Sequence, residues 1–165
     1  MWLIAGLGNP GPAYAGQRHN AGFMALDAIA HAYGAGAWAD KYKSELAKAT
    51  IAGDACLLAK PQTFMNRSGV AVRECATFYK VPPADWVVIH DELDLDPAVL
   101  RLKKGGGTAG HRGLESIFEE TGELDFWRIR IGIGKRKPVE KYVLERIPPS
   151  EESAFEETFG RAVQA

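Results

Sequence analysis

The sequence has few of the residues that mark disulfide-stabilised, metal-binding or membrane proteins. Its 165 residues include two cysteines and four histidines. Cys56 and Cys75 lie in the apolar contexts DACLLA and RECATF, without metal or redox spacing, so we interpret them as reduced core thiols of a cytoplasmic protein. No apolar run approaches the ~20 residues of a membrane span. The start MWLIAGLG lacks the basic region and cleavage site of a signal peptide. We therefore expect neither a membrane segment nor a signal peptide.

Charge of either sign is nearly balanced, but it is unevenly distributed. The net charge is −1, which does not by itself indicate a nucleic-acid-binding protein. Residues 98–137 carry nine Lys or Arg against five Asp or Glu, whereas residues 1–97 carry eight against ten and residues 138–165 three against six. The excess lies in RLKK and RIRIGIGKRK. A local basic patch can bind phosphates, although an ordinary solvated face would look the same.

Hydrophobic periodicity predicts alternating strands and helices. Expected strands cover residues 2–7, 86–93, 98–104 and 125–134, with a hairpin at 45–52 and 55–60. Expected helices cover residues 20–34, 68–79, 114–122 and 151–165. This alternation is typical of an α/β fold, so we expect one domain over residues 1–165 with a mixed, mostly parallel twisted sheet and helices on both faces. Ligands bind at the carboxyl ends of such strands, which places the chemistry in the loops after the first strand, after WVVI and after LRLKK.

Three familiar signatures are absent or incomplete. The glycines of GLGNPG match the dinucleotide-binding spacing, but two prolines and Gly16 disfavour the helix that must begin inside that motif. The histidines, at positions 19, 31, 90 and 111, form no metal-binding spacing, so we predict no metal site. No G-x-S-x-G is present for a serine nucleophile.

The segment QRHNAGF contains the most suggestive polar residue, His19. From spacing alone, a structural histidine at a helix start is the stronger interpretation. The alternative pairs His19 with Asp91, which follows directly on the apolar strand WVVIH. A carboxylate that holds one imidazole nitrogen would leave the other free to take a proton from water.

Five segments carry a family resemblance when they are taken together and in order: LIAGLGNPGPAYAGQRHNAGF, KPQTFMNRSGVAV, VIHDELDLD, LRLKKGGGTAGHRGL and DFWRIRIGIGK. Over residues 3–144 the chain resembles bacterial-type peptidyl-tRNA hydrolases. The resemblance implies an enzyme that cleaves the ester between a peptide, or an N-blocked aminoacyl group, and the 3′ end of tRNA, and so recycles tRNA released during translation. It also implies a cytoplasmic monomer that uses no metal or other cofactor.

The resemblance implies a role for each matching residue. His19 would be the general base that activates water, and Asp91 would orient it. Asn9 would sense the amide of the blocked aminoacyl group, and Asn66 would bind substrate and steady the oxyanion or the water. Contacts with the end of the tRNA are implied for Tyr14 and Phe64. The basic block at 98–137 would then bind tRNA phosphates through Lys103, Lys104, Arg130 and Lys135.

Two departures from the family pattern leave alternatives open. Arg112 stands where the family usually has an asparagine; its guanidinium can donate to substrate or to a tRNA phosphate but cannot accept a hydrogen bond from water. The chain also ends at Ala165, whereas most family members continue for some tens of residues into a C-terminal helix. The two interpretations are a short member of the family and a truncated C-terminal helix. The competing hypotheses are a non-catalytic RNA-binding relative and a general esterase or peptidase.

Overall fold

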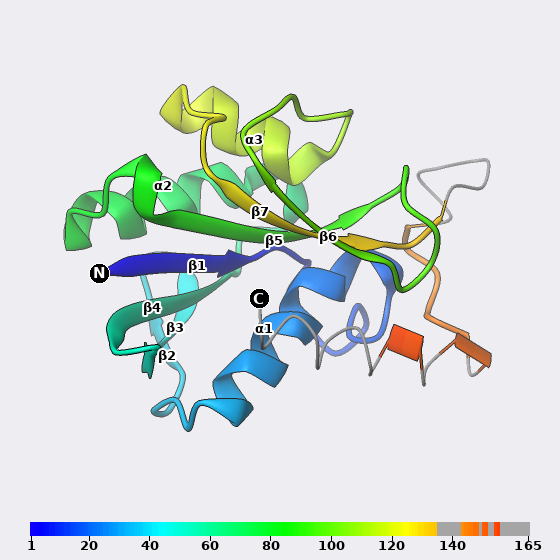
Figure 1. The fold of residues 1–165 in the computed structure, drawn as a ribbon, viewed down its shortest axis with the longest axis horizontal. Helices are drawn as coiled ribbons and strands as arrows, with labels where there is room; N and C mark the ends of the chain where they lie inside the picture. Colours follow the sequence, from blue (N-terminus) through cyan, green and yellow to red (C-terminus); the bar gives the residue numbers. More distant parts are fainter. Residues whose placement is uncertain (135–142, 149, 152–153, 156–165) are drawn as a thin grey trace.

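A seven-stranded mixed sheet with strand order β2-β3-β4-β1-β5-β7-β6 forms the centre of the molecule (Figure 1). The computed structural model describes residues 1–134, 143–148, 150–151 and 154–155. The strands are β1 (Trp2–Gly6), β2 (Ala39–Lys41), β3 (Ser44–Ile51), β4 (Asp54–Pro61), β5 (Trp86–Glu92), β6 (Leu100–Lys104) and β7 (Trp127–Gly132). The helices are α1 (Ala21–Ala32), α2 (Ser68–Tyr79) and α3 (Arg112–Thr121), with 3-10 turns η1 (Arg18–Asn20), η2 (Met65–Arg67) and η3 (Pro83–Asp85).

The sequence-based prediction of an α/β fold with a mixed sheet is confirmed. Strands β4, β1, β5 and β7 run parallel in the middle, while β2, β3 and β6 pair antiparallel at the two edges. Within the described residues, each predicted helix and strand agrees with the structure to within two residues at either end. The predicted helix over 151–165 lies largely outside those residues, and β2 was not predicted because its three residues are all exposed and show no apolar alternation.

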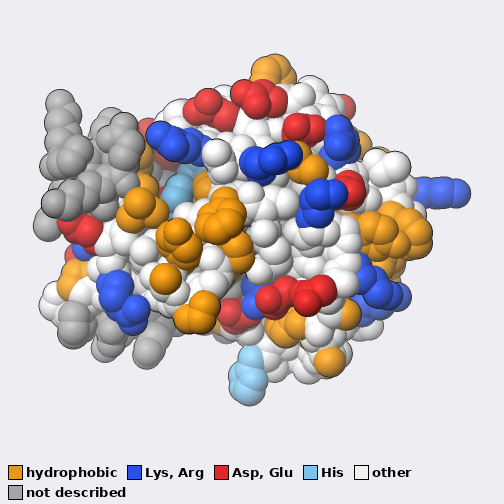
Figure 2. Space-filling model, turned by 180° about the vertical axis from the view of Figure 1, so that it is seen from behind, with side chains coloured by type: hydrophobic (Ala, Val, Ile, Leu, Met, Phe, Trp, Pro, Cys, Tyr) orange, Lys and Arg blue, Asp and Glu red, His pale blue; other side chains and the backbone are white. Residues whose placement is uncertain are grey.

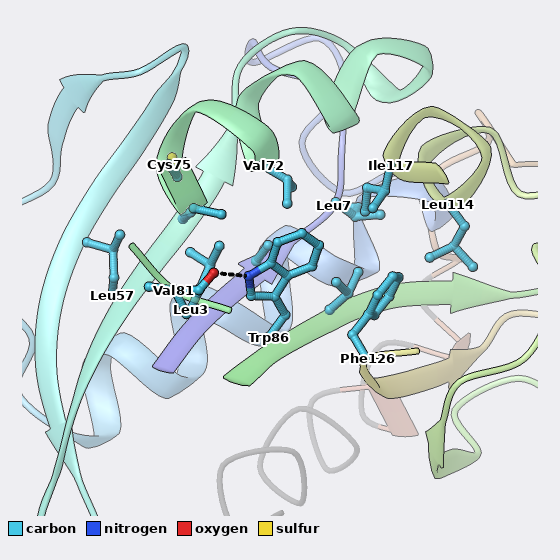
Figure 3. Packing of buried hydrophobic residues seen from close by; sticks show 14 of the residues in the cluster. Leu3, Leu7, Leu57, Val72, Cys75, Val81, Trp86, Leu114, Ile117 and Phe126 are labelled. Atoms are coloured by element: carbon cyan, nitrogen blue, oxygen red, sulfur yellow. Dashed lines mark hydrogen bonds between the residues drawn. The ribbon is translucent and has the colours of Figure 1, made fainter. Parts of the chain in front are cut away.

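Helices cover both faces of the sheet, as the alternation predicted (Figure 1). Helices α2 and α3 pack on one face, where Trp86 and Phe126 fill the space beneath them (Figure 3). The indole nitrogen of Trp86 donates to the carbonyl of Val81 at 2.9 Å, which satisfies its one buried polar atom. Helix α1 covers the other face over a second apolar cluster that includes Leu58, Ile89 and Ile131. None of the helices in the described ranges is long and apolar enough to cross a membrane.

The segment that follows β6 takes a path that the sequence did not indicate. Because β6 is antiparallel to β7, its last residue, Lys104, lies opposite Trp127 at the start of β7. The carboxyl end of β6 therefore lies at the opposite end of the strands from the carboxyl ends of β1 and β5. The expected direction of β6 was wrong, although the loop that follows it does reach the end of β5 through His111, as the sequence predicted for this loop. Residues 105–110, hereafter the glycine loop, run back along the α3 side of the sheet to the start of α3 (Figure 1).

Gly22 lets the start of α1 lie directly on the sheet. A Cβ at this position would stand 2.5 Å from the carbonyl oxygens of both Leu7 and Ile89, closer than any real contact. Gly22 thereby holds η1, with His19 at its centre, over the ends of β1 and β5.

We expect Gly22→Ala to lower the free energy of unfolding by about 1–3 kcal/mol, because the added methyl must push the helix off two backbone carbonyls. Urea denaturation measures this directly. Gly36→Ala is the matched control, since a Cβ there meets no atom within 4 Å. Equal stability of the two variants would contradict the close approach.

Candidate active site

The turn that carries His19 lies beside two joined strands and is fixed by backbone hydrogen bonds to residues 143 and 145. The amide of Leu7 donates to the carbonyl of Ile89 at 3.0 Å, which joins the chain leaving β1 to β5. The amides of Arg18 and His19 donate to the carbonyls of Glu145 and Val143, each at 2.9 Å. The His19 ring is nearly buried beside the ends of β1 and β5.

Asp91, at the end of β5, lies between two histidines. Its Oδ2 is 2.7 Å from Nδ1 of His19, and its Oδ1 is 2.8 Å from Nε2 of His111. The carboxyl is 2% exposed, and burial alone would oppose its ionisation. The two imidazoles and the hydrogen bonds that they donate outweigh burial and hold the pKa of Asp91 well below its usual range. Asp91 is therefore an ionised, buried carboxylate with both oxygens occupied.

The hydrogen bonds also assign the tautomers of these histidines. Nδ1 of His111 accepts from the amides of Gly113 and Leu114, at 3.1 and 3.3 Å, and so caps the N-terminus of α3. A nitrogen that accepts carries no proton, so the proton of His111 is on Nε2 and is donated to Asp91. The other oxygen of Asp91 accepts Nδ1–H from His19, which leaves Nε2 of His19 with a free lone pair.

A third histidine, His90, packs against this pair and stays neutral. Burial, and then the neighbouring ring of His111, lower the pKa of His90 to about 3, against the opposing effect of Asp91. Its Nδ1 donates to the carbonyl of Asp91 at 2.7 Å, and its ring meets that of His111 edge-on at 5.0 Å. His90 therefore supports the position of Asp91 and His111 without adding charge.

Asn9 is held by two other polar groups. The side chain of Asn20 accepts from the amide of Asn9 at 2.7 Å and donates to its carbonyl at 2.9 Å. The side-chain Oδ1 of Asn9 accepts from the amide of Met65 at 2.7 Å. The Nδ2 of Asn9 donates to no atom of the described residues, and Asn9 lines the cavity next to His19. Asn9 is therefore oriented as a hydrogen-bond donor.

A cavity of about 460 Å³ opens over these groups, a size typical of small-molecule sites. It brings together seven of the eleven residues that the sequence singled out for the site: Asn9, Tyr14, His19, Phe64, Asn66, Asp91 and Arg112. Figure 2 shows histidine side chains in this hollow, between basic side chains on one border and hydrophobic side chains on the other.

Two aromatic side chains border the cavity. Tyr14 and Phe64 meet edge-to-face with their ring centroids 5.8 Å apart. Phe64 has a φ of 63° and a ψ of 157°, a combination that favours glycine and strains any other residue. This backbone conformation precedes the amide of Met65, which donates to Asn9. The strain thus accompanies the contact that orients Asn9.

The basic residues divide into two groups. Arg112 is the first residue of α3, is exposed, and lines the cavity with no ion-pair or hydrogen-bond partner for its guanidinium in the described part of the chain. Lys103, on the edge strand β6, and Arg130, on the neighbouring β7, do not line the cavity, and Arg130 lies 3.7 Å from Glu92. Lys104 lies over the ring of Trp127 at 5.8 Å. The remaining predicted residue, Lys135, is outside the described ranges.

Comparison with known proteins identifies the family of this chain. The model of the peptidyl-tRNA hydrolase family matches residues 3–165. The chain belongs to the peptidyl-tRNA hydrolase family. It is 52% identical over 147 residues to the peptidyl-tRNA hydrolase of Azorhizobium caulinodans, covering 87% of this chain and 72% of that protein. It is 49% identical to that of Methylocella silvestris, covering 100% of this chain and 85% of the relative. A crystal structure of peptidyl-tRNA hydrolase from Acinetobacter baumannii superposes with a TM-score of 0.93 at 40% identity, covering 99% of this chain and 85% of that one.

Among the described residues, one group of side chains could be considered as ligands of a metal ion, namely His19, Asp91 and His111. Two ligands of one tetrahedral zinc lie about 3.3 Å apart, given metal–ligand distances of about 2 Å. The nitrogen–oxygen distances here are 2.7 and 2.8 Å, which are those of hydrogen bonds with a proton between the atoms. The geometry fits a hydrogen-bonded triad better than a metal centre.

Sequence reasoning placed three further residues in the loops of the site but gave them no role. His111 links Asp91 to α3, Asn20 holds Asn9, and Met65 orients its side chain. A signal existed for His111, because it lies three residues before the helix predicted over 114–122, where a side chain can accept from backbone amides. Neither Asn20 nor Met65 had such a signal, since their contacts join segments that are distant in the sequence.

The depressed pKa of His90 predicts a specific dependence of stability on pH. The unfolded chain binds a proton at His90 below about pH 6.5, while the folded protein does not until about pH 3. The stability that comes from neutral His90 is therefore complete above pH 6.5 and is lost as the pH falls towards 3. Between these limits we expect His90→Gln to flatten the decline in unfolding free energy by about 1 kcal/mol per pH unit.

Chemical denaturation at a series of pH values between 6.5 and 4 measures these slopes. His31→Gln is the control because His31 is exposed at the end of α1, and it should leave the wild-type slope unchanged. A His90→Gln slope equal to that of the wild type would show that His90 is charged in the folded protein.

Proposed function

We propose that this chain hydrolyses the ester between a peptide, or an N-blocked aminoacyl group, and the 3′ end of tRNA, with His19 as the general base. The observation that carries the proposal is the fixed tautomer of His19. Asp91 holds Nδ1–H, so the free lone pair on Nε2 belongs to a side chain that lines the cavity, beside the donor of Asn9. Action in the cytoplasm as a monomer stays a prediction from the family resemblance.

In the proposed reaction, Nε2 of His19 takes a proton from a water molecule as its oxygen attacks the ester carbonyl carbon. The positive charge that develops on the imidazole is stabilised by ionised Asp91, which does not itself take up the proton. The tetrahedral intermediate then releases the 3′ oxygen of the ribose, which receives the proton from His19. The peptide leaves with a free carboxylate, and His19 returns to its starting tautomer.

The amide side chains supply the binding of the acyl group. Because Oδ1 of Asn9 already accepts from Met65, only Nδ2 is available, so Asn9 donates to a carbonyl oxygen of the peptide. Asn66, on η2 and at the wall of the cavity, would donate to the oxyanion through its side-chain amide. Donors that are already oriented cost little reorganisation when the negative charge develops.

The aromatic and basic groups provide the contacts with the tRNA. Tyr14 and Phe64 offer ring faces and edges on which a terminal base can stack, an interaction that tolerates any sequence. Arg112 stands at the cavity wall, close enough to the reactive centre to bind a phosphate near the 3′ end. Lys103 and Arg130 lie further out and would bind the backbone of the acceptor stem. Phosphate contacts add affinity without sequence selection, as an enzyme acting on many tRNAs requires.

We expect the wild-type protein to release the acyl group from an N-blocked aminoacyl-tRNA but not from the unblocked form. His19→Ala should lower turnover by roughly 10²- to 10⁴-fold because the general base is lost, while tRNA affinity is kept. Single-turnover hydrolysis and filter binding measure the two quantities, with His31→Ala as the control. Binding without release by the wild type would favour the non-catalytic RNA-binding relative. Release from both forms would favour a general esterase, and full turnover by His19→Ala would exclude His19 as the base.

The role of Arg112 is tested by Arg112→Asn, which restores the residue that the family usually has. We expect KM to rise roughly three- to ten-fold, the effect of losing about 1 kcal/mol from one exposed contact between a charge and a phosphate. The difference should shrink as salt is raised, because salt screens that contact. Arg73→Asn, which removes a cation paired with Glu120 on the α2–α3 surface, is the control. A large gain in turnover would instead show that Arg112 hinders the reaction.

A further inference from the structure

Arg128 is the one basic side chain of the described β6–β7 edge that is buried. It is 3% exposed, whereas Lys103, directly opposite on β6, is exposed. No carboxylate in the described residues forms an ion pair with Arg128. Its guanidinium instead donates to the carbonyls of Gly107 and Gly106, the second at 2.8 Å, and to the carbonyl of Leu124 at 2.9 Å. It also lies 4.9 Å from the ring centroid of Phe126. A charge with these partners is too enclosed to meet a phosphate.

Two of these carbonyls belong to the glycine loop, where it crosses the α3 side of the sheet. The loop is joined to the sheet at its start by the amide of Gly105, which donates to the carbonyl of Phe126 at 2.9 Å. Gly105 and Gly106 have φ values of +71° and +105°, so this part of the loop has few backbone preferences of its own. Arg128 therefore supplies hydrogen bonds that fix a path which the local sequence does not fix.

The loop ends at His111, which is the link to the catalytic pair. The amide of His111 donates to the carbonyl of Thr108 at 2.9 Å, one residue beyond the part held by Arg128. The ring of His111 then caps α3 through one nitrogen and donates to Asp91 through the other. A chain of contacts thus runs from Arg128 through the glycine loop to His111, then to Asp91 and His19.

We propose that Arg128 is a positioning residue for the hydrolysis proposed above: it holds the glycine loop on the sheet and so places Nε2–H of His111 against Asp91. This inference rests on the proposed function only for its kinetic consequence. Arg128 differs in kind from Arg130, two residues along the same strand, which is partly exposed and whose proposed partner is the tRNA backbone. The two arginines should therefore affect different kinetic constants.

Arg128→Met, with Arg130→Met as the matched control, separates these roles in assays with N-blocked aminoacyl-tRNA. Arg128→Met should lower kcat by roughly 10- to 100-fold with little change in KM, because a displaced His111 no longer holds the Asp91–His19 pair in place. Arg130→Met should act mainly on KM and should weaken the salt dependence of binding. Arg128→Lys keeps the charge but cannot reach three carbonyls, so its kcat should fall by less than that of Arg128→Met. If Arg128→Met does not fold, Arg128→Lys takes its place in the comparison with Arg130→Met.

A double-mutant cycle tests the route through His111. In a His111→Ala background, Arg128→Met should lower kcat by less than about two-fold, since the group that it positions is already gone. An equal fall in both backgrounds would overturn the proposal, as would a variant whose only change is a lower Tm.

The imidazole N–H resonances in proton NMR give a readout that does not need turnover. The wild type should show slowly exchanging signals from Nδ1–H of His19 and Nε2–H of His111, and Arg128→Met should lose the second. If the wild type proves inactive on the blocked substrate, the proposed function fails while this measurement still decides the positioning role. Retention of both signals in Arg128→Met would exclude that role.

Discussion

The buried carboxylate of Asp91 is the constraint on which the rest of the site depends. A negative charge at 2% exposure must be met by hydrogen-bond donors, and both oxygens are met by imidazole N–H groups. This requirement sets the position of His19, which the 3-10 turn places over the ends of β1 and β5. It also sets the position of His111. The glycine loop leads to this residue from the carboxyl end of β6, which lies at the opposite end of the strands. Neutral His90 fills the remaining space without competing for the charge.

The side chain of Asn9 is oriented in the same way as that of His19: a partner occupies one of its polar atoms, which leaves the other polar atom for the substrate. Asn20 holds both backbone groups of Asn9, and Met65 occupies its side-chain oxygen. Asn9 is therefore presented in one orientation, as His19 is by Asp91. A site arranged in this way lowers the reorganisation that accompanies charge development. The strained backbone at Phe64 precedes one of these contacts, so the fold tolerates strain where an orientation is needed.

The positive charges of the middle block divide according to the depth at which the strands place them. In the sequence, Arg128 and Arg130 look equivalent, since both belong to the alternating run WRIRIG. In the sheet, Arg128 lies under the glycine loop and bonds to its carbonyls, whereas Arg130 is partly exposed beside Glu92. Charge in this part of the chain thus serves both the internal structure and the surface, and only burial distinguishes the two.

Local pattern in the sequence determined most helices and strands, and with them the α/β class, because hydrophobic periodicity is a property of neighbouring residues. The order of the motifs along the chain was enough to make the pairing of His19 with Asp91 a hypothesis. The tertiary structure alone decided the rest. Strand β6 is antiparallel, so the glycine loop must cross the sheet, and this crossing gives His111 and Arg128 their partners. The tautomer of His19 and the orientation of Asn9 likewise depend on contacts between residues 56 to 72 positions apart. Strand direction and such distant hydrogen bonds are set by how the whole chain packs, which no short segment encodes.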